Sequence, residues 1–147
     1  LNLFNLLYLG DSGAYLVSFV VGAILIYIHQ NNSFISPYFI ALLLWYPAFE
    51  NFFSIVRKKI NKTNPVDPDT EHLHQLIFKF INNRNFIFHK YSNQISSIAI
   101  VLYSSIVFLI SVNFITKTNH MILLIILNIV VYLVTYTYLK NKNKEVS

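Results

Sequence analysis

Four long apolar segments constrain the fold of this 147-residue chain more than any other feature of its sequence. They run over about 11–29, 34–56, 95–115 and 121–139. About 17–25 helical residues cross a bilayer core, and each segment has that length. Open strands leave backbone groups unsatisfied in lipid, so the segments should be helices. The predicted fold class is an all-α polytopic membrane protein, with four transmembrane helices in a single membrane-embedded region, 1–147.

The composition also points to lipid as the surrounding medium. Hydrophobic residues make up 55% of the chain and charged residues only 12%, whereas roughly a quarter of the residues of a soluble domain are charged. Cysteine is absent, which excludes disulfides and thiolate metal sites. The net charge of +5 does not indicate a nucleic-acid partner, because the basic residues lie in loops beside the apolar segments.

The basic residues predict how the chain is oriented. All but one of the 11 Lys and Arg residues lie either between the second and third apolar segments or after the fourth. The positive-inside rule therefore places the loop 57–94 and the C-terminus in the cytoplasm. With four spans, the start of the first span is cytoplasmic too. The one basic residue outside these two regions is Lys117.

The loop 57–94 is long enough to have a function of its own. Its prolines, Pro65 and Pro68, predict an extended or turned stretch. An amphipathic helix should follow, capped by Asp69 or Thr70, and it should lie along the membrane surface. Its apolar stripe follows the i, i+3, i+4, i+7, i+8 pattern. The stripe is Leu73, Leu76, Ile77, Phe80 and Ile81.

Two motifs in cytoplasmic positions could carry chemistry. Asp11, between glycines at the mouth of the first span, could hold Mg²⁺ beside arriving phosphates or could simply cap the helix. His72 and His74 would face the same side only if the chain is extended there, so that the helix starts late or bends. Metal binding is one alternative, but two histidines without a third ligand nearby make a weak case for a zinc site. A pair of solvated surface histidines is the alternative reading.

Glu50 is an acidic residue inside the second apolar segment. Ionisable residues in spans are usually functional. The alternative is a structural partner for a polar group on a neighbouring helix. Two turns later the chain reaches the basic cluster that begins with Arg57.

The order of these motifs resembles a known family. Gly-Asp before a span is followed by Pro-x-x-acidic at Pro47 and Glu50, by the basic cluster, and by Pro-Asp-x-x-His-x-His ending at His74. This order resembles the C-terminal third of the polyprenyl-phosphate N-acetylhexosamine-1-phosphate transferases (glycosyltransferase family 4), relatives of phospho-MurNAc-pentapeptide translocase. The resemblance covers about 5–80. The chain departs from it at Gln75, where many members have His, and at Glu50, where Asp is common.

The resemblance implies a transfer of N-acetylhexosamine-1-phosphate from a UDP-sugar to polyprenyl (undecaprenyl) phosphate, with release of UMP. Such reactions initiate O-antigen, enterobacterial common antigen and teichoic acid synthesis. Mg²⁺, or alternatively Mn²⁺, would be the cofactor, held by Asp11. The setting would be the bacterial cytoplasmic membrane, with the active site on its cytoplasmic face, and a homodimer is left open. The implied catalytic residues are Asp11, His72 and His74, and the implied substrate-binding residues are Arg57, Gln75 and Glu50.

The family's paired aspartates and its Asn/Asp-Gly motif belong to an N-terminal portion that this sequence does not contain. We therefore expect the 147 residues to be the C-terminal part of a larger transferase and to be inactive alone. Two other readings account for the hydropathy equally well. One is a non-catalytic four-span membrane protein, and the other is an inactive truncated relative.

Overall fold

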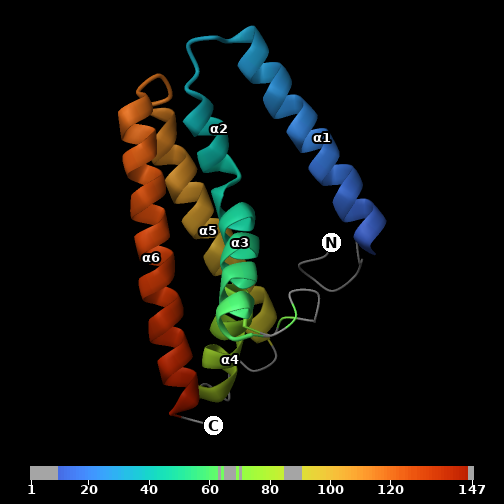
Figure 1. The fold of residues 1–147 in the computed structure, drawn as a ribbon, viewed down its shortest axis with the longest axis vertical. Coiled ribbons are helices and arrows are strands. Elements are labelled where there is room, and N and C mark those ends of the chain that lie inside the picture. The colour runs from blue at the N-terminus through green and yellow to red at the C-terminus, as the bar shows by residue number, and fades with distance from the viewer. Residues whose placement is uncertain (1–9, 63, 65–68, 70, 85–90, 146–147) are drawn as a thin grey trace.

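The structure is a computed structural model that describes residues 10–62, 64, 69, 71–84 and 91–145. Within these residues the chain forms six helices and no strand (Figure 1). The predicted all-α class is therefore confirmed. The helices are α1 (Gly10–Asn31), α2 (Pro37–Leu43), α3 (Trp45–Ile60), α4 (Leu73–Arg84), α5 (Ser92–Val112) and α6 (Thr118–Lys144).

Three of these helices, α1, α5 and α6, are long and apolar enough to cross a membrane. A fourth span exists if α2 and α3 together count as one, although they are bent by 69° relative to each other. The fold is thus that of a helical membrane protein with three candidate spans, or up to four. The prediction of one continuous helix over 34–56 is wrong, because the helix breaks at Leu44.

Pro47 explains the position of the break. Proline has no N–H, and its ring collides with the carbonyl four residues earlier, which is that of Leu43. The helix α2 ends at Leu43. In α3 the proline is the third residue, within the first turn, where backbone N–H groups have no partner inside the helix anyway. The same proline therefore ends one helix and is tolerated at the start of the next.

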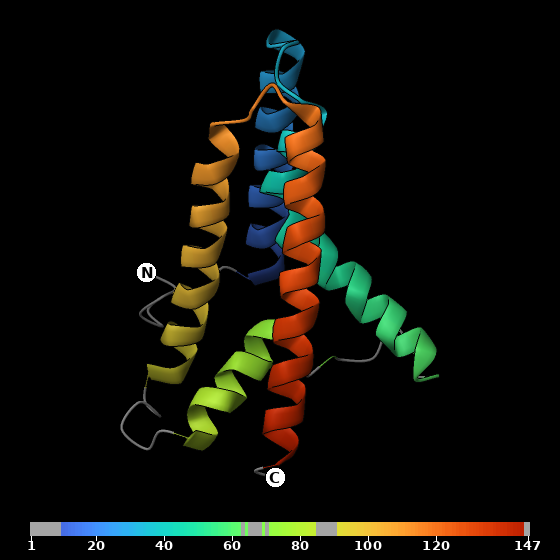
Figure 2. The same cartoon turned by 90° about the vertical axis from the view of Figure 1, so that its left-hand side faces the viewer.

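The helices α5 and α6 run antiparallel, and other helices join them at both ends (Figure 2). At one end α4 packs against both, and at the other end α2 does so. Halfway along, the Tyr103 hydroxyl of α5 donates a hydrogen bond to the Asn128 side chain of α6. Asn128 is fully buried and also donates to the Leu124 carbonyl at 2.7 Å. Buried polar groups need such partners, so this pair ties the two helices together.

The apolar stripe of α4 faces protein. Leu73 and Leu76 are buried, and Ile77 and Phe80 pack against the same core. A helix that carries the stripe Leu73–Ile81 is predicted from the sequence, and its presence is confirmed. The stripe packs on α5 and α6, and the expected position of this helix along the membrane surface stays a prediction. Burial of several large apolar side chains, each worth about 1.5–3 kcal/mol, holds α4 in place.

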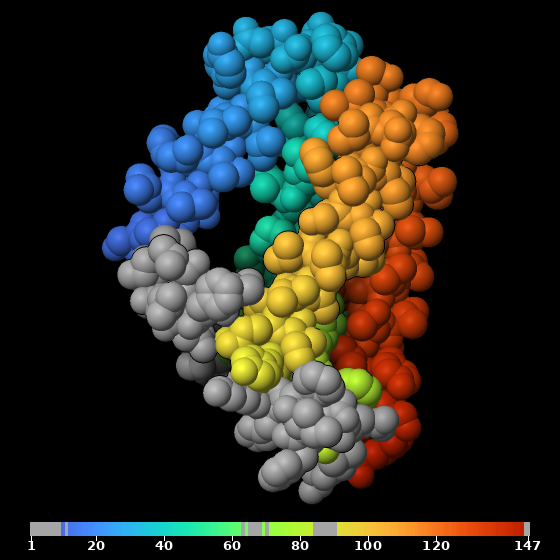
Figure 3. Space-filling model, turned by 180° about the vertical axis from the view of Figure 1, so that it is seen from behind, coloured from blue at the N-terminus to red at the C-terminus, as the bar shows by residue number. Residues whose placement is uncertain are grey.

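In contrast, α1 stands apart from the other helices (Figure 3). None of its span is buried, and large side chains such as Tyr15 and Phe19 are exposed. At the far end of the molecule the chain turns twice, between α1 and α2 and between α5 and α6 (Figure 1). There Ser36 N–H donates to the Ile115 carbonyl at 3.0 Å. At the opposite end of the molecule lie the C-terminal end of α3, the helix α4 and the C-terminal end of α6.

Candidate functional site

The candidate site lies where the end of α3, the start of α4 and the last turns of α6 meet. His72 precedes α4, which begins at Leu73, and His74 is in its first turn. The two imidazole rings are nearly parallel, with centroids 5.7 Å apart and an interplanar angle of 12°. The two histidines were expected to face one side only if the helix started late. Because α4 begins after His72, this condition is met.

The start of α4 is capped by side chains from within the helix and from α3. Leu73 N–H donates to Glu50 Oε1 at 2.7 Å. Gln75 Oε1 accepts from His72 N–H at 3.2 Å, which is one half of a capping box. The prediction that Asp69 caps α4 is wrong, because the helix begins four residues later; Thr70 lies outside the described residues. Asp69 Oδ1 instead accepts from Glu71 N–H at 2.9 Å and closes a turn ahead of the helix.

Asp69 forms a nearly buried ion pair with Arg57. The two side chains are 9% and 11% exposed, and the Ser54 hydroxyl donates to the same carboxylate oxygen. Burial opposes ionisation of Asp69. The hydrogen bonds from Ser54 and from the Glu71 backbone, together with the Arg57 charge, outweigh it and hold the pKa of Asp69 below its usual value. Asp69 thus links the loop to α3.

Arg57 also joins the loop to α6. Its Nη1 donates to the Glu71 carbonyl at 2.7 Å and to the Tyr136 hydroxyl at 2.6 Å. The Glu71 carboxylate accepts from Lys140 at 2.7 Å and from Tyr136 at 3.2 Å. The hydrogen bond from Lys140 is the main reason why the pKa of Glu71 lies below its usual value. The guanidinium of Arg57, which the resemblance assigned to substrate, therefore points into the protein.

His74 has a different environment from His72. Its ring is exposed on one side, and partial desolvation lowers its pKa below the usual value. Glu50 acts against this shift and the neighbouring His72 ring adds to it. The neutral form of His74 therefore prevails at neutral pH, and a neutral imidazole donates one hydrogen bond.

Asp69 predicts how the stability of the protein depends on pH. Folding lowers its pKa, so the unfolded chain binds more protons in acid, and the free energy of unfolding rises with pH. The stabilisation is complete above the usual Asp pKa of about 3.9 and is lost as the pH falls through the lower pKa of the folded state. We expect the unfolding temperature in detergent to fall more steeply below about pH 4 in the wild type than in Asp69→Asn. Equal slopes would contradict the assignment. Glu145→Gln, which removes the exposed partner of Lys142, is the control and should keep the wild-type slope.

The remaining predicted residue, Asp11, is in the first turn of α1, and its side chain is outside the description. Whether Asp11 converges with the histidines therefore stays a prediction. Within the described ranges, no three His, Asp or Glu side chains are arranged to hold a metal ion. Asp69 and Glu50, the nearest carboxylates, already accept hydrogen bonds from protein groups. The described residues thus do not fit a magnesium site by themselves.

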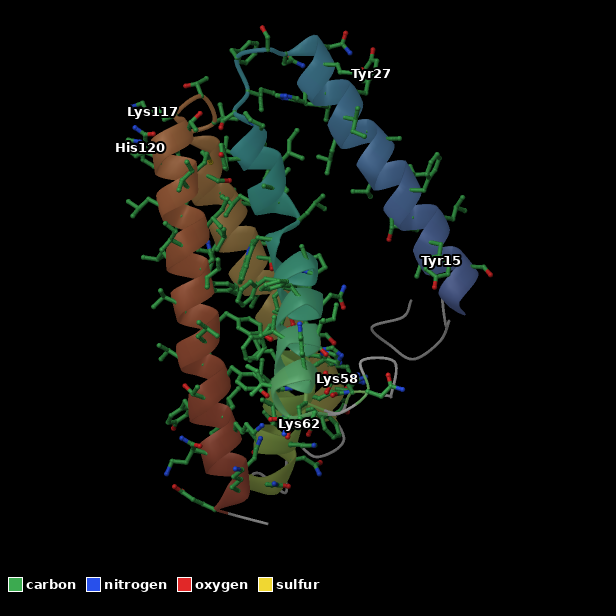
Figure 4. All side chains as sticks on the ribbon, in the orientation of Figure 1. Tyr15, Tyr27, Lys58, Lys62, Lys117 and His120 are labelled. Carbon is green, nitrogen blue, oxygen red and sulfur yellow. The ribbon has the colours of Figure 1, made fainter. Side chains whose placement is uncertain are left out.

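Tyr136 and Lys140 also belong to the site, although the sequence did not predict them as site residues. Tyr136 reads as one more aromatic residue in an apolar span, and Lys140 as one of the basic residues after it. Both bind Glu71, from 65 and 69 residues away in the sequence. The clustering of Lys at the end of the last span was the only local signal. Figure 4 shows that Lys58 and Lys62 lie beside the same end, whereas Lys117 and His120 lie at the opposite one.

The fold and this polar cluster define a helical membrane protein with a charged, histidine-bearing site at one end of its helices. Comparisons of the chain with protein-family models, with curated proteins and with solved structures found no match.

Proposed function

We propose that this chain carries part of a membrane-bound phosphoglycosyl transferase, which moves N-acetylhexosamine-1-phosphate from a UDP-sugar to polyprenyl phosphate. The observation that carries the proposal is the parallel pair of His72 and His74 rings at the basic end of the helices. We assign four spans to the chain, with the bent pair α2–α3 as the second. The site then faces the cytoplasm in a bacterial inner membrane, by the positive-inside rule.

The reaction brings two polyanions together. A phosphate oxygen of the lipid attacks the β-phosphorus of the UDP-sugar, the bond from that phosphorus to the bridging oxygen breaks, and UMP leaves with that oxygen. Donors held in place before the reaction stabilise the charge that develops. A neutral imidazole donates one hydrogen bond and an imidazolium donates two. In this proposal, His72 and His74 hold the sugar-nucleotide diphosphate.

The lipid substrate would require an apolar surface below the site. Two mostly apolar cavities, of about 190 and 320 Å³, flank Trp45 and Tyr46 near the bend between α2 and α3. Leu73, next to His72, lines the smaller cavity. Apolar cavities with a few polar groups at one end are typical ligand sites. The position of the two cavities is compatible with a bound polyprenyl chain whose phosphate lies at the histidines.

Mg²⁺ would neutralise phosphate charge in such a reaction, and Asp11 is the residue to which we assign it. A carboxylate suits this hard cation.

The second candidate function is that of a non-catalytic membrane protein, including an inactive relative of the transferases. One observation favours it: ion pairs link Asp69 to Arg57, Arg57 to Glu71, and Glu71 to Lys140. A site that served only to tie the loop to α3 and α6 would look the same at these four residues. It would not require the parallel histidine rings.

The test is a transferase assay on the full-length protein that contains this sequence, in membrane vesicles. With UDP-N-acetylglucosamine or UDP-N-acetylgalactosamine, polyprenyl phosphate and Mg²⁺, we expect UMP to be released only when the lipid is present. Vesicles without the protein are the control. No lipid-dependent release from either sugar nucleotide would favour the non-catalytic candidate.

A further inference from the structure

Glu50 has an unusual position for a charged side chain. It lies in α3, within the bent pair that we count as the second span, and is only 7% exposed. Its Oε1 accepts from Leu73 N–H at 2.7 Å and lies 3.0 Å from His72 Nδ1. One oxygen therefore contacts both the backbone where α4 begins and the ring of the residue before it.

A cap alone does not account for this carboxylate. Ser, Thr or Asn caps a helix as well as Asp does and is cheaper to bury. Negative charge at a helix N-terminus is favourable, but the effect is small, typically 0.3–1 kcal/mol. A longer acidic side chain also reaches the imidazole ring of His72, while its other oxygen, Oε2, is buried on the side of the Tyr46 and Tyr132 hydroxyls.

That contact fixes which ring nitrogen carries the proton. Oε1 accepts from Leu73 N–H, so it acts as an acceptor, and we assign the proton that faces it to Nδ1. The partner of one imidazole nitrogen determines the state and direction of the other. His72 Nε2 is on the far edge of the ring, 3.8 Å from Asp69 Oδ2 and beyond hydrogen-bonding distance of it.

Direct binding of substrate by Glu50, which the resemblance implied, fits the geometry less well. Its Oε1 is engaged by α4, and a carboxylate repels a diphosphate at short range. We infer that Glu50 is a positioning residue, which holds the start of α4 and, through Nδ1–H, orients His72 so that Nε2, which donates in the imidazolium form, faces the phosphates of the sugar nucleotide. This inference rests on the proposed function for the role of Nε2. The contact between Glu50 and His72 stands without it.

A kinetic cycle on the full-length protein tests the inference. Glu50→Ala should lower kcat by about 10–100-fold, the usual cost of losing a partner that orients a working histidine. Because Glu50 acts through His72, the same change in a His72→Ala background should cost less than about twofold. Losses that multiply would overturn the orienting role, since they would mean that Glu50 acts independently of His72.

Two further measurements keep the test decisive if Glu50→Ala fails to fold or if the protein shows no transferase activity. Glu50→Gln keeps an oxygen that can accept from both Leu73 N–H and His72 Nδ1–H, so it should fold and lose about fivefold or less in kcat. A loss as large as that of His72→Ala would instead indicate a charge that contacts metal or substrate. Glu145→Ala, at the exposed end of α6, is the matched control.

The second measurement needs no activity. In ¹⁵N spectra of histidine-labelled protein in lipid, the His72 signals are identified by their loss in His72→Ala. Glu50→Ala, or Glu50→Val if the alanine variant is unstable, should move the His72 Nδ1 signal and leave that of His120 in place. An unchanged His72 signal would overturn the positioning role. Absence of activity together with a shifted signal would overturn the proposed function only.

Discussion

Replacing His72 or His74 with alanine is expected to lower the rate of sugar-phosphate transfer by about 10²–10³-fold, the typical cost of losing one fixed donor to a developing charge. Both rings are on one side of the start of α4, and their parallel arrangement gives a diphosphate two donors at once. Gln75→Ala should be milder, because the Gln75 side chain accepts a hydrogen bond from the His72 backbone. The measurement is kcat and KM for the sugar nucleotide in the full-length protein.

His120 provides the control for these variants. It stacks on Phe114 at the opposite end of the helices, with ring centroids 4.9 Å apart. His120→Ala should therefore leave the transfer rate at its wild-type value. If His72→Ala and His74→Ala both kept wild-type kcat/KM, the histidine pair would be only a polar edge of α4, and the non-catalytic candidate would gain support.

Loss of the Arg57 side chain should have the largest effect on stability. Arg57→Met removes one partner of a nearly buried ion pair and leaves the Asp69 charge uncompensated, which typically costs 3–5 kcal/mol. The variant also removes the donors to the Glu71 carbonyl and the Tyr136 hydroxyl. We expect a lower free energy of unfolding in mixed detergent micelles, and the loop should become more accessible to protease.

Two variants separate the ion pair from a general effect of charge. Lys59→Met removes an exposed charge two residues along α3 and should change the free energy of unfolding by about 0.5 kcal/mol or less. The double variant Arg57→Met with Asp69→Asn should recover part of the loss, because no unpaired buried charge remains. If Arg57→Met were no more destabilising than Lys59→Met, the contacts of Arg57 would not hold the loop in place.

Local sequence patterns were sufficient to predict most of the helices and part of the site. The apolar segments predicted α1, α5 and α6 to within a few residues, and the stripe beginning at Leu73 predicted α4. The late start needed for His72 and His74 to face one side also follows from helical geometry. The break at Leu44 could have been deduced from Pro47, since α2 ends at the residue whose carbonyl the proline ring excludes.

The rest of the site depends on contacts between distant parts of the chain. Glu50 reaches His72 and Leu73 from 22 and 23 residues away, and Tyr136 reaches Glu71 from 65. No periodicity or capping motif encodes such pairs. The packing of the α4 stripe on α5 and α6 also depends on such contacts, because an amphipathic stripe does not reveal whether lipid or another helix covers it. Asp11 and its convergence with the histidines stay a prediction.

Tracing the β-phosphate of the donor is the most direct test of the central claim. Full-length protein in vesicles is given UDP-N-acetylhexosamine labelled with ³²P at the β-phosphate, together with polyprenyl phosphate and Mg²⁺. Phosphoglycosyl transfer moves the label into the lipid fraction and releases unlabelled UMP in equal amount, and the His72→Ala variant should do so about 10²–10³-fold more slowly. Label that stays in UDP while sugar enters the lipid, or label that never enters the lipid, would contradict the account.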